Sequence, residues 1–494
     1  MRLSPSSLPV LGVVLLLGGC VAVGPDYSPP PMATPTSFGE APSGVSPDAV
    51  EATWWRAFDE PMLDGLIRRA LAANLDVGIA AARVEEARAL LRETRRDGLA
   101  SGGVAASHER RRRSQSERSA GGPAEIETYR GVVDASWEID LFGRVRRSTE
   151  AATAEVGSRE ALLRGVQASV AAEVAAVWFE LRGAEAELAM VGEISASQRQ
   201  SLQVTERLQA AGAATAFDRL RAETLLRDVE AAAPELERRR AAAANALAVL
   251  VGETPQAFRP PLAAPSREAL TVQTIAVGNP GELLARRQDI AAAERRLAAA
   301  TARIGAATAD LYPRIEVQGS IGLLAGSLDA IDGPGADSWF ISPILRWALL
   351  DSGRVRARIA ASEARAREAL IAYDRTVLLA LRETDDAFKA YGAASMILRS
   401  RLQEAAASRE AARLARLRFA GGEGDYLDVL DAERSDFASQ RSLAVARTDQ
   451  RLAVVSIYKA LGGGWEVCAQ RDGGCMGDVE PPRRPAGRDP KRFP

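Results

Sequence analysis

The chain has 494 residues and is nearly neutral, with 63 basic and 65 acidic side chains, so no bulk positive charge indicates a nucleic-acid partner. Its single histidine, His108, excludes a histidine-based triad and a histidine-rich metal site. Aromatic residues make up only 5% of the chain, which favours long, closely packed helices over a large aromatic core. Acids and arginines are plentiful but form no recognisable catalytic arrangement, so we predict neither an enzyme nor a cofactor.

Residues 1–19 have the pattern of a lipoprotein signal peptide. A basic start is followed by an apolar run that is too short to span a bilayer. This run ends in "LGGC", a lipobox, which predicts cleavage before Cys20 and acylation of that cysteine. Val21, where aspartate would favour retention on the inner membrane, indicates sorting to the outer membrane. The alternative is an ordinary signal peptide with a chance cysteine.

An internal repeat organises most of the mature chain. The stretch "WEIDLFGRVR" (137–146) returns as "WALLDSGRVR" (347–356), and "FDRLRAE" (217–223) aligns at the same offset with "LDVLDAE" (427–433). We therefore predict a lipidated extended arm, a first repeat, a linker, a second repeat and a C-terminal tail, at residues 20–61, 62–252, 253–276, 277–462 and 463–494.

Each repeat is predicted to begin with a helix, at 62–98 and at 280–311. A β-hairpin follows each helix, at 99–141 and 312–347, because apolar and polar residues alternate with a period of two. The alternating segments have the length of membrane strands, about 9–11 residues, with Trp and Tyr near their ends.

A long stretch rich in Ala, Leu, Arg and Glu follows each strand pair. A glycine-bearing turn breaks each stretch, near residues 212 and 422, so both are predicted to be antiparallel helical hairpins. An arm of about 65 residues would be roughly 100 Å long.

Four strands are too few to close a membrane barrel, and open sheet edges are not tolerated in hydrocarbon. Several copies of the chain are therefore expected to share one barrel, with their helical hairpins forming a hollow tube. The rival interpretation is a periplasmic coiled-coil lipoprotein that forms no pore. That rival explains the helices and Cys20 but not the alternating strands or the repeat.

Six motifs spread over most of the chain identify a known family. They are "VGPDYSPP" (23–30), "WWRAFDEPMLDGLIRRAL" (54–71), "LLARRQDIAAAERRLAAATARIGAATADLYPRIEVQGSIG" (283–322), "LLDSGR" (349–354), "LDVLDAERSDF" (427–437) and "ALGGGW" (460–465). By these motifs the chain resembles the TolC/OprM-like outer-membrane factors of Gram-negative efflux systems, in particular their lipoprotein branch. Gln288 departs from the family pattern, which usually has proline there, and this change is expected to affect only the start of a helix.

The resemblance implies a mixed α/β membrane protein that forms a homotrimer. Long helices would build a trimeric periplasmic α-barrel with an equatorial region, and four strands per chain would build a 12-stranded transmembrane β-barrel. The expected partners are outer-membrane lipid, a periplasmic adaptor and an inner-membrane pump. The pump is expected to be of the resistance-nodulation-division (RND) type. The expected function is export of drugs or other small molecules, and the alternatives are another pump class or a type I secretion system.

The acidic stretch "GDYLDVLDAE" (424–433) starts the last long helix. Asp425 is expected to cap that helix, with Asp428 three residues on in a box-like arrangement, as Thr215 and Asp218 stand in the first repeat. Asp431 has Arg221 as its counterpart, so capping does not explain it. The resemblance implies that Asp428 and Asp431 line a periplasmic gate; the alternative is a solvated helix end.

The two turns are predicted to be adaptor-docking tips, and the plainer alternative is that glycine only makes each turn. Their residues are Ala211, Gly212, Ala213, Gly421, Gly422 and Glu423. The basic run 108–118 is expected to be a solvated loop between strands, with contact to lipopolysaccharide phosphates as the alternative. Cys468 and Cys475 could close a small disulfide loop in an exported protein.

Overall fold

The computed structural model describes residues 22–31, 44–46, 48, 51–119, 122–260 and 275–464. Cys20, Cys468 and Cys475 lie outside these residues. The chain divides into two units. The sheet unit comprises the described parts of residues 1–32, 82–161 and 291–375, and the hairpin unit those of 33–81, 162–290 and 376–494.

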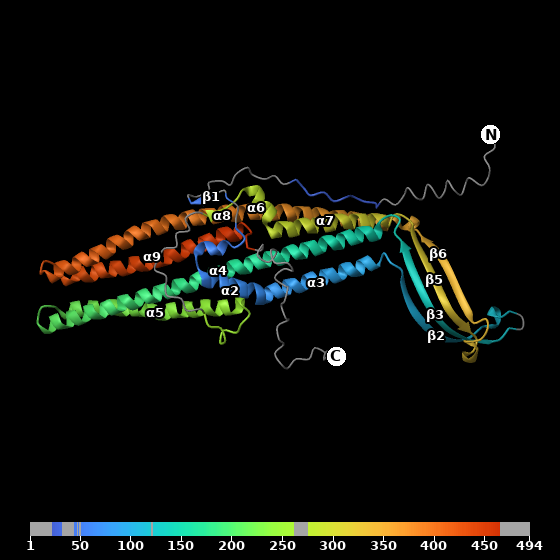
Figure 1. Ribbon diagram of the computed structural model, residues 1–494, viewed down its shortest axis with the longest axis horizontal. Coiled ribbons are helices and arrows are strands. Elements are labelled where there is room, and N and C mark those ends of the chain that lie inside the picture. Colours follow the sequence, from blue (N-terminus) through green and yellow to red (C-terminus); the bar gives the residue numbers. More distant parts are fainter. Residues whose placement is uncertain are drawn as a thin grey trace, which may run out of the picture. The chain divides into compact units, whose positions relative to one another are not determined.

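The sheet unit contains one antiparallel sheet of four strands (Figure 1). Its strands, in sheet order, are β2 (Ser101–Arg112), β3 (Glu125–Ile139), β5 (Arg314–Ala325) and β6 (Asp337–Arg346). Val133 lies opposite Ile321 on one face, and Ser136 lies opposite Gln318 on the other. Val133, Ile321 and Trp339 are all at least half exposed, so one face is apolar and open. The predicted period of two is confirmed.

Two tryptophans close the same end of the sheet in the two repeats. The indole Nε1–H of Trp137 donates to the carbonyl of Gly98 at 3.1 Å, and that of Trp347 donates to the carbonyl of Leu311 at 2.9 Å. Each acceptor follows the helix that precedes a hairpin, so the two hairpins are fixed to their helices by the same contact.

The basic run is only partly a loop. Residues 108–112 continue β2, and His108 stacks on Tyr129 of β3 with ring centroids 4.4 Å apart. Arg110 pairs across the strands with Glu125 at 2.8 Å. The expectation of a loop is therefore wrong for the first half of the run, because cross-strand pairing extends the hairpin beyond the apolar segment.

The helices that were expected to open each repeat are each divided in two. The pairs are α2 (Pro61–Ala73) with α3 (Leu75–Arg96), and α6 (Pro280–Arg286) with α7 (Gln288–Ala309). Asn74 has extended backbone, and its side-chain oxygen accepts from the backbone N–H groups of Asp76 and Val77, so it ends α2 and caps α3. Helix α7 begins at Gln288, which also accepts a 2.7 Å hydrogen bond from Arg164.

Long helices form two hairpins, which are connected by short turns (Figure 1). The first consists of α4 (Arg144–Ala210) and α5 (Ala216–Leu250), and the second of α8 (Ser352–Ala420) and α9 (Tyr426–Ala460). Gly212 and Gly422 have φ values of 75° and 76°, which favour glycine in both turns. Helix α4 is long and apolar enough to cross a membrane, but core helices pass the same test.

Several aromatic residues form one buried core in the hairpin unit. Trp54 stacks on Tyr458 with centroids 4.9 Å apart, and Phe58 contacts Phe179 at 4.6 Å. Trp54 and Phe58 belong to a 3₁₀ turn (Trp54–Phe58) and are almost fully buried. Beside this core, β1 (Val45–Ser46) pairs in parallel with β4 (Ile275–Ala276). The arm and the linker therefore meet in a two-stranded sheet.

Candidate functional site at the helical tips

The two turns predicted to dock a partner are exposed. Ala211, Gly212 and Ala213 lie in the turn between α4 and α5, and Gly421, Gly422 and Glu423 in the turn between α8 and α9. Both turns lie at the same end of the hairpin unit (Figure 1). A Cβ atom placed on Gly212 or Gly422 would meet no atom within 4 Å. The glycines are therefore needed for their backbone angles rather than for close packing.

The first tip has the expected capping box. The hydroxyl of Thr215 accepts from the backbone N–H of Asp218 at 3.2 Å, and the Asp218 carboxylate accepts from the Thr215 N–H at 2.8 Å. Hydrogen bonds from the Thr215 side chain and backbone hold the pKa of Asp218 below its usual value. This end of α5 is thus fixed by a reciprocal pair.

The second tip does not repeat the box. Asp425 accepts from the backbone N–H of Leu427 at 3.2 Å and caps α9 alone. In the part of the chain that the structure describes, the Asp428 carboxylate forms no hydrogen bond or ion pair. The expected box-like role of Asp428 is therefore wrong, because its side chain does not turn back to the N-cap residue.

Asp428 and Asp431 are both exposed and, three residues apart on α9, share one face of the helix. Asp431 pairs with Arg434 at 2.9 Å, and both side chains are more than half exposed. Exposed ion pairs of this kind are weak, so Arg434 offsets the negative charge of Asp431 only in part. The structure thus places the two predicted gate carboxylates on one open surface, with an arginine beside one of them.

Glu433 differs from the other acids of this stretch because it is buried, with 3% of its surface exposed. Its carboxylate accepts from the Gln198 amide at 3.0 Å and the Ser201 hydroxyl at 3.3 Å, both on α4. It also pairs with Arg416 of α8 at 2.8 Å. One carboxylate therefore joins α9 to both of these helices.

Tyr426, the first residue of α9, adds a second polar link between the hairpins. Its hydroxyl donates to the backbone carbonyl of Ser201 at 2.9 Å, and burial raises its pKa. Its ring lies in an apolar cluster contributed by α5 and α9, which consists of Ala222, Leu225, Tyr426, Val429 and Leu430. We call the polar and apolar contacts of Tyr426 and Glu433 with the first hairpin the tip latch.

Sequence reasoning missed the tip latch, although Glu433 was part of the acidic stretch. Its position two residues after Asp431 turns it about 200° around the helix, away from the exposed carboxylates. This change of helix face was the local signal in the sequence, but the partners on α4 cannot be identified from it.

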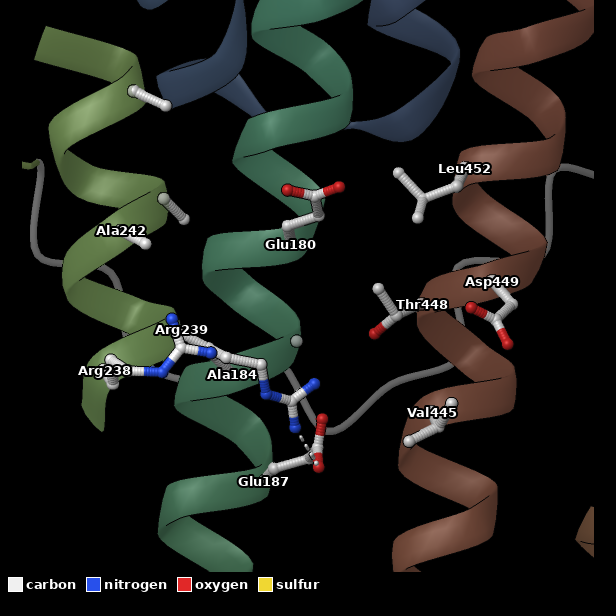
Figure 2. Close-up of a pocket in the computed structure, with 13 residues that line it drawn as sticks. Glu180, Ala184, Glu187, Arg238, Arg239, Ala242, Val445, Thr448, Asp449 and Leu452 are labelled. Atoms are coloured by element: carbon white, nitrogen blue, oxygen red, sulfur yellow. Dashed lines mark hydrogen bonds and ion pairs between the residues drawn. The ribbon is translucent and has the colours of Figure 1, made fainter. Parts of the chain in front are cut away.

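A cavity of about 570 Å³ lies further from the tips, between α4, α5 and α9 (Figure 2). Arg239 of α5 pairs with the buried Glu187 of α4 at 3.1 Å along its wall. A Cβ atom on Gly183 would lie 2.4 Å from the Thr448 hydroxyl, so α4 and α9 approach closely there. None of the predicted gate or docking residues lines this cavity, and we regard it as a packing gap between hairpins.

Known proteins resemble this chain over nearly its whole length. A family model described as outer membrane efflux protein matches residues 66–253 and 279–463. The chain is 33% identical over 472 residues to outer membrane protein OprJ of Pseudomonas aeruginosa, covering 94% of this chain and 97% of OprJ. It is 33% identical over 477 residues to the toluene efflux pump outer membrane protein TtgI of Pseudomonas putida, with coverages of 93% and 98%.

A solved structure, that of the outer-membrane channel OprN, has the same fold. It superposes with a TM-score of 0.84 at 37% sequence identity, covering 90% of this chain and 100% of the other. The likeness extends over the long helices and the four antiparallel strands, so it concerns the whole architecture rather than one part of it.

Proposed function

Because the chain belongs to the outer membrane efflux protein family and is an outer-membrane channel component of efflux pumps, we propose that it works as a homotrimeric duct. Its fold is TolC-like and its family is non-enzymatic. A channel is incompatible with the pore-free spacer interpretation. In the proposed trimer, each chain contributes four strands to a 12-stranded barrel and two helical hairpins to a periplasmic tube.

The observation that carries the trimer is the four-stranded sheet with an apolar, exposed face. Within the described chain, β2 and β6 each have one neighbour, and such edges must be paired in hydrocarbon. Pairing β2 of one copy with β6 of the next closes the sheet. Native mass spectrometry and single-channel recording test this proposal: a trimer that conducts is expected, and a monomer without current would contradict it.

The proposed location is the outer membrane, with acyl chains on Cys20 as a second attachment besides the barrel. The support is the lipobox that ends at Cys20. Each CH₂ group of an acyl chain that is buried in the bilayer contributes about 0.8 kcal/mol to membrane attachment. Mass spectrometry of the N-terminal peptide is expected to show an acylated cysteine. An unmodified Cys20 in protein from a native membrane would contradict this part of the proposal.

We propose that Asp428 and Asp431 form the periplasmic gate and that the tip latch favours its closed state. Three copies would bring six carboxylates together, which favours cations. Repulsion between carboxylates cannot close a gate, whereas the links from Glu433 and Tyr426 to α4 hold the two hairpins together. The double variant Asp428→Ala/Asp431→Ala is expected to change conductance or cation selectivity; unchanged values would remove this assignment.

The two exposed turns are the proposed docking surface for a periplasmic adaptor. Ala213 and Glu423 are suited to testing this, because neither has the positive φ that Gly212 and Gly422 require. Cysteines at positions 213 and 423 are expected to cross-link to the adaptor in an assembled pump. A cysteine at Glu410, an exposed residue of α8 away from the turn, is the matched control.

The proposed inner-membrane partner is a pump of the RND type, and the proposed cargo is drugs or other small molecules. The support is the likeness to relatives such as TtgI, whose name places it in a toluene efflux pump. The alternatives to an RND pump are a pump of another class and a type I secretion system. Affinity purification of the full-length trimer from its native membrane distinguishes them by the inner-membrane protein recovered with it.

A further inference from the structure

The arm that follows Cys20 is seated on the sheet unit over residues 22–27, which we call the strap. The backbone N–H of Val23 donates to the carbonyl of Phe142 at 3.1 Å. At the other end of the strap, the Tyr27 hydroxyl donates to the carboxylate of Glu294 on α7. The strap has neither helix nor strand, so these contacts rather than a sheet hold it in place.

The centre of the strap is held by Arg147, whose side chain is only 6% exposed. Its guanidinium donates to the carbonyls of Val23 and Gly24 at 3.1 and 3.3 Å and pairs with Asp26 at 2.6 Å. Its guanidinium also pairs with Glu150, one turn along α4, at 2.9 Å. A buried guanidinium needs acceptors, and the strap supplies most of them, so Arg147 and the strap stabilise each other.

Glycines fix the position of the strap along its seat. Gly24 has a φ of 91°, and a Cβ atom there would lie 2.3 Å from the Cα of Gly305 on α7. Gly143 has a φ of 83°, and a Cβ atom there would lie 2.5 Å from the Cβ of Ala22. A shift of the strap by one residue would place a side chain against Gly305, so only one register fits.

The strap begins beside the ends of the strands. Ala22 abuts Gly143, which follows β3 by a few residues. The ring of Phe142 stacks on Tyr312, just before β5, with centroids 4.6 Å apart. One residue, Val21, separates Cys20 from Ala22, so the Cα atoms of Cys20 and Ala22 are at most about 7 Å apart.

We propose that Arg147 is a positioning residue that fixes where the lipid anchor leaves the protein, at the ends of the strands. This inference rests on the proposed acylation of Cys20. Because its contacts fix the strap, the distance from the protein to the acyl chains is limited to the short segment between Cys20 and Ala22. The acyl chains therefore enter the bilayer next to the proposed barrel, at its periplasmic edge.

The test uses full-length protein from native membranes in which a photoreactive fatty acid has been incorporated at Cys20. In the wild type, most cross-links are expected within residues 137–142 and 312–315, near the strand ends. In Arg147→Met these cross-links are expected to fall at least fivefold, and hydrogen exchange of the Val23 amide to become at least tenfold faster. Arg159→Met is the matched control, because Arg159 lies further along α4 and pairs with Glu155 of its own helix at 3.2 Å.

A second variant, Gly305→Ala, removes no charge but places a Cβ atom 2.9 Å from the Arg147 side chain. It is expected to displace the guanidinium and so to release the strap in the same way. Unchanged cross-links and exchange in both variants would overturn the proposal. An unacylated Cys20 with a protected Val23 amide would contradict the proposed acylation but not the fixing of the strap by Arg147. Failure of the proposed acylation can therefore be distinguished from failure of this inference. Equal exchange changes throughout α9 would indicate general unfolding and would also overturn the proposal.

Discussion

The carboxylate of Glu433 on α9 accepts a 3.0 Å hydrogen bond from the side-chain amide of Gln198 on α4, 235 residues earlier in the chain. Asp431, two residues before Glu433, is exposed on the other side of the helix. A short acidic stretch thus supplies one carboxylate to the surface and another to the contact between hairpins. The tip latch and the proposed gate can therefore be separated by substitution.

Glu433→Ala is expected to loosen the two hairpins near their tips. The substitution leaves Gln198 and Ser201 without their acceptor in a buried contact, which costs about 1–3 kcal/mol per unsatisfied group. Because the tip latch is proposed to favour the closed state of the gate, we expect more frequent or longer openings of the purified trimer in a planar bilayer.

The control for this prediction is Glu410→Ala. Glu410 is exposed and pairs only with Arg413 of its own helix among the residues described, so it removes a carboxylate without touching the tip latch. Similar conductance changes in both variants would show that the general loss of charge, rather than the contact with α4, is responsible.

Arg434→Ala is expected to increase the preference of the channel for cations. Arg434 pairs with Asp431 at 2.9 Å and partly offsets its charge at the proposed gate. The reversal potential of the trimer in a salt gradient measures this preference directly. Arg413→Ala, which frees the exposed Glu410 instead, is the matched control, and a shift of Arg434→Ala toward anions would contradict the prediction.

The regular parts of this fold could be predicted because local sequence determines them. Alternation with a period of two identified the strands, and the glycine turns identified the hairpins. The division at Asn74 was missed, although asparagine is a good N-cap, because a continuous apolar period runs through it. Periodicity reports which face is buried but does not report a one-residue change of direction.

The candidate site was predictable only in part, for a different reason. Thr215 and Asp218 form a capping box, whereas Asp425 and Asp428 at the equivalent positions do not. The choice depends on side-chain conformation at the helix start, which the residue types leave open. The contacts of Glu433 join segments far apart in the chain, and no local pattern specifies such a partner.

Trp347→Phe is expected to destabilise the trimer. The indole N–H of Trp347 donates to the carbonyl of Leu311 and joins β6 to the end of the preceding helix region, a contact that phenylalanine cannot make. Loss of such a hydrogen bond costs about 0.5–1.5 kcal/mol. The measurement is the temperature at which the trimer dissociates in detergent.

Trp339→Phe is the comparison for that variant. Trp339 is 71% exposed, opposite Ile321 in the sheet, and its indole forms no hydrogen bond within the described residues. It loses a similar aromatic surface without losing a donor to the helix end. If both substitutions lowered the dissociation temperature equally, the hydrogen bond to Leu311 would not be the cause.

The first tip is expected to loosen in acid through Asp218. Hydrogen bonds from Thr215 depress the pKa of Asp218 in the folded protein, so its carboxylate stabilises the start of α5 above the ordinary aspartate value of about 3.9. This stabilisation is lost as the pH falls through the depressed value. A nitroxide on a cysteine at position 213, in the adjacent turn, is therefore expected to become more mobile below about pH 4. Asp218→Asn cannot titrate and should abolish this change; the same pH dependence in that variant would place its origin elsewhere.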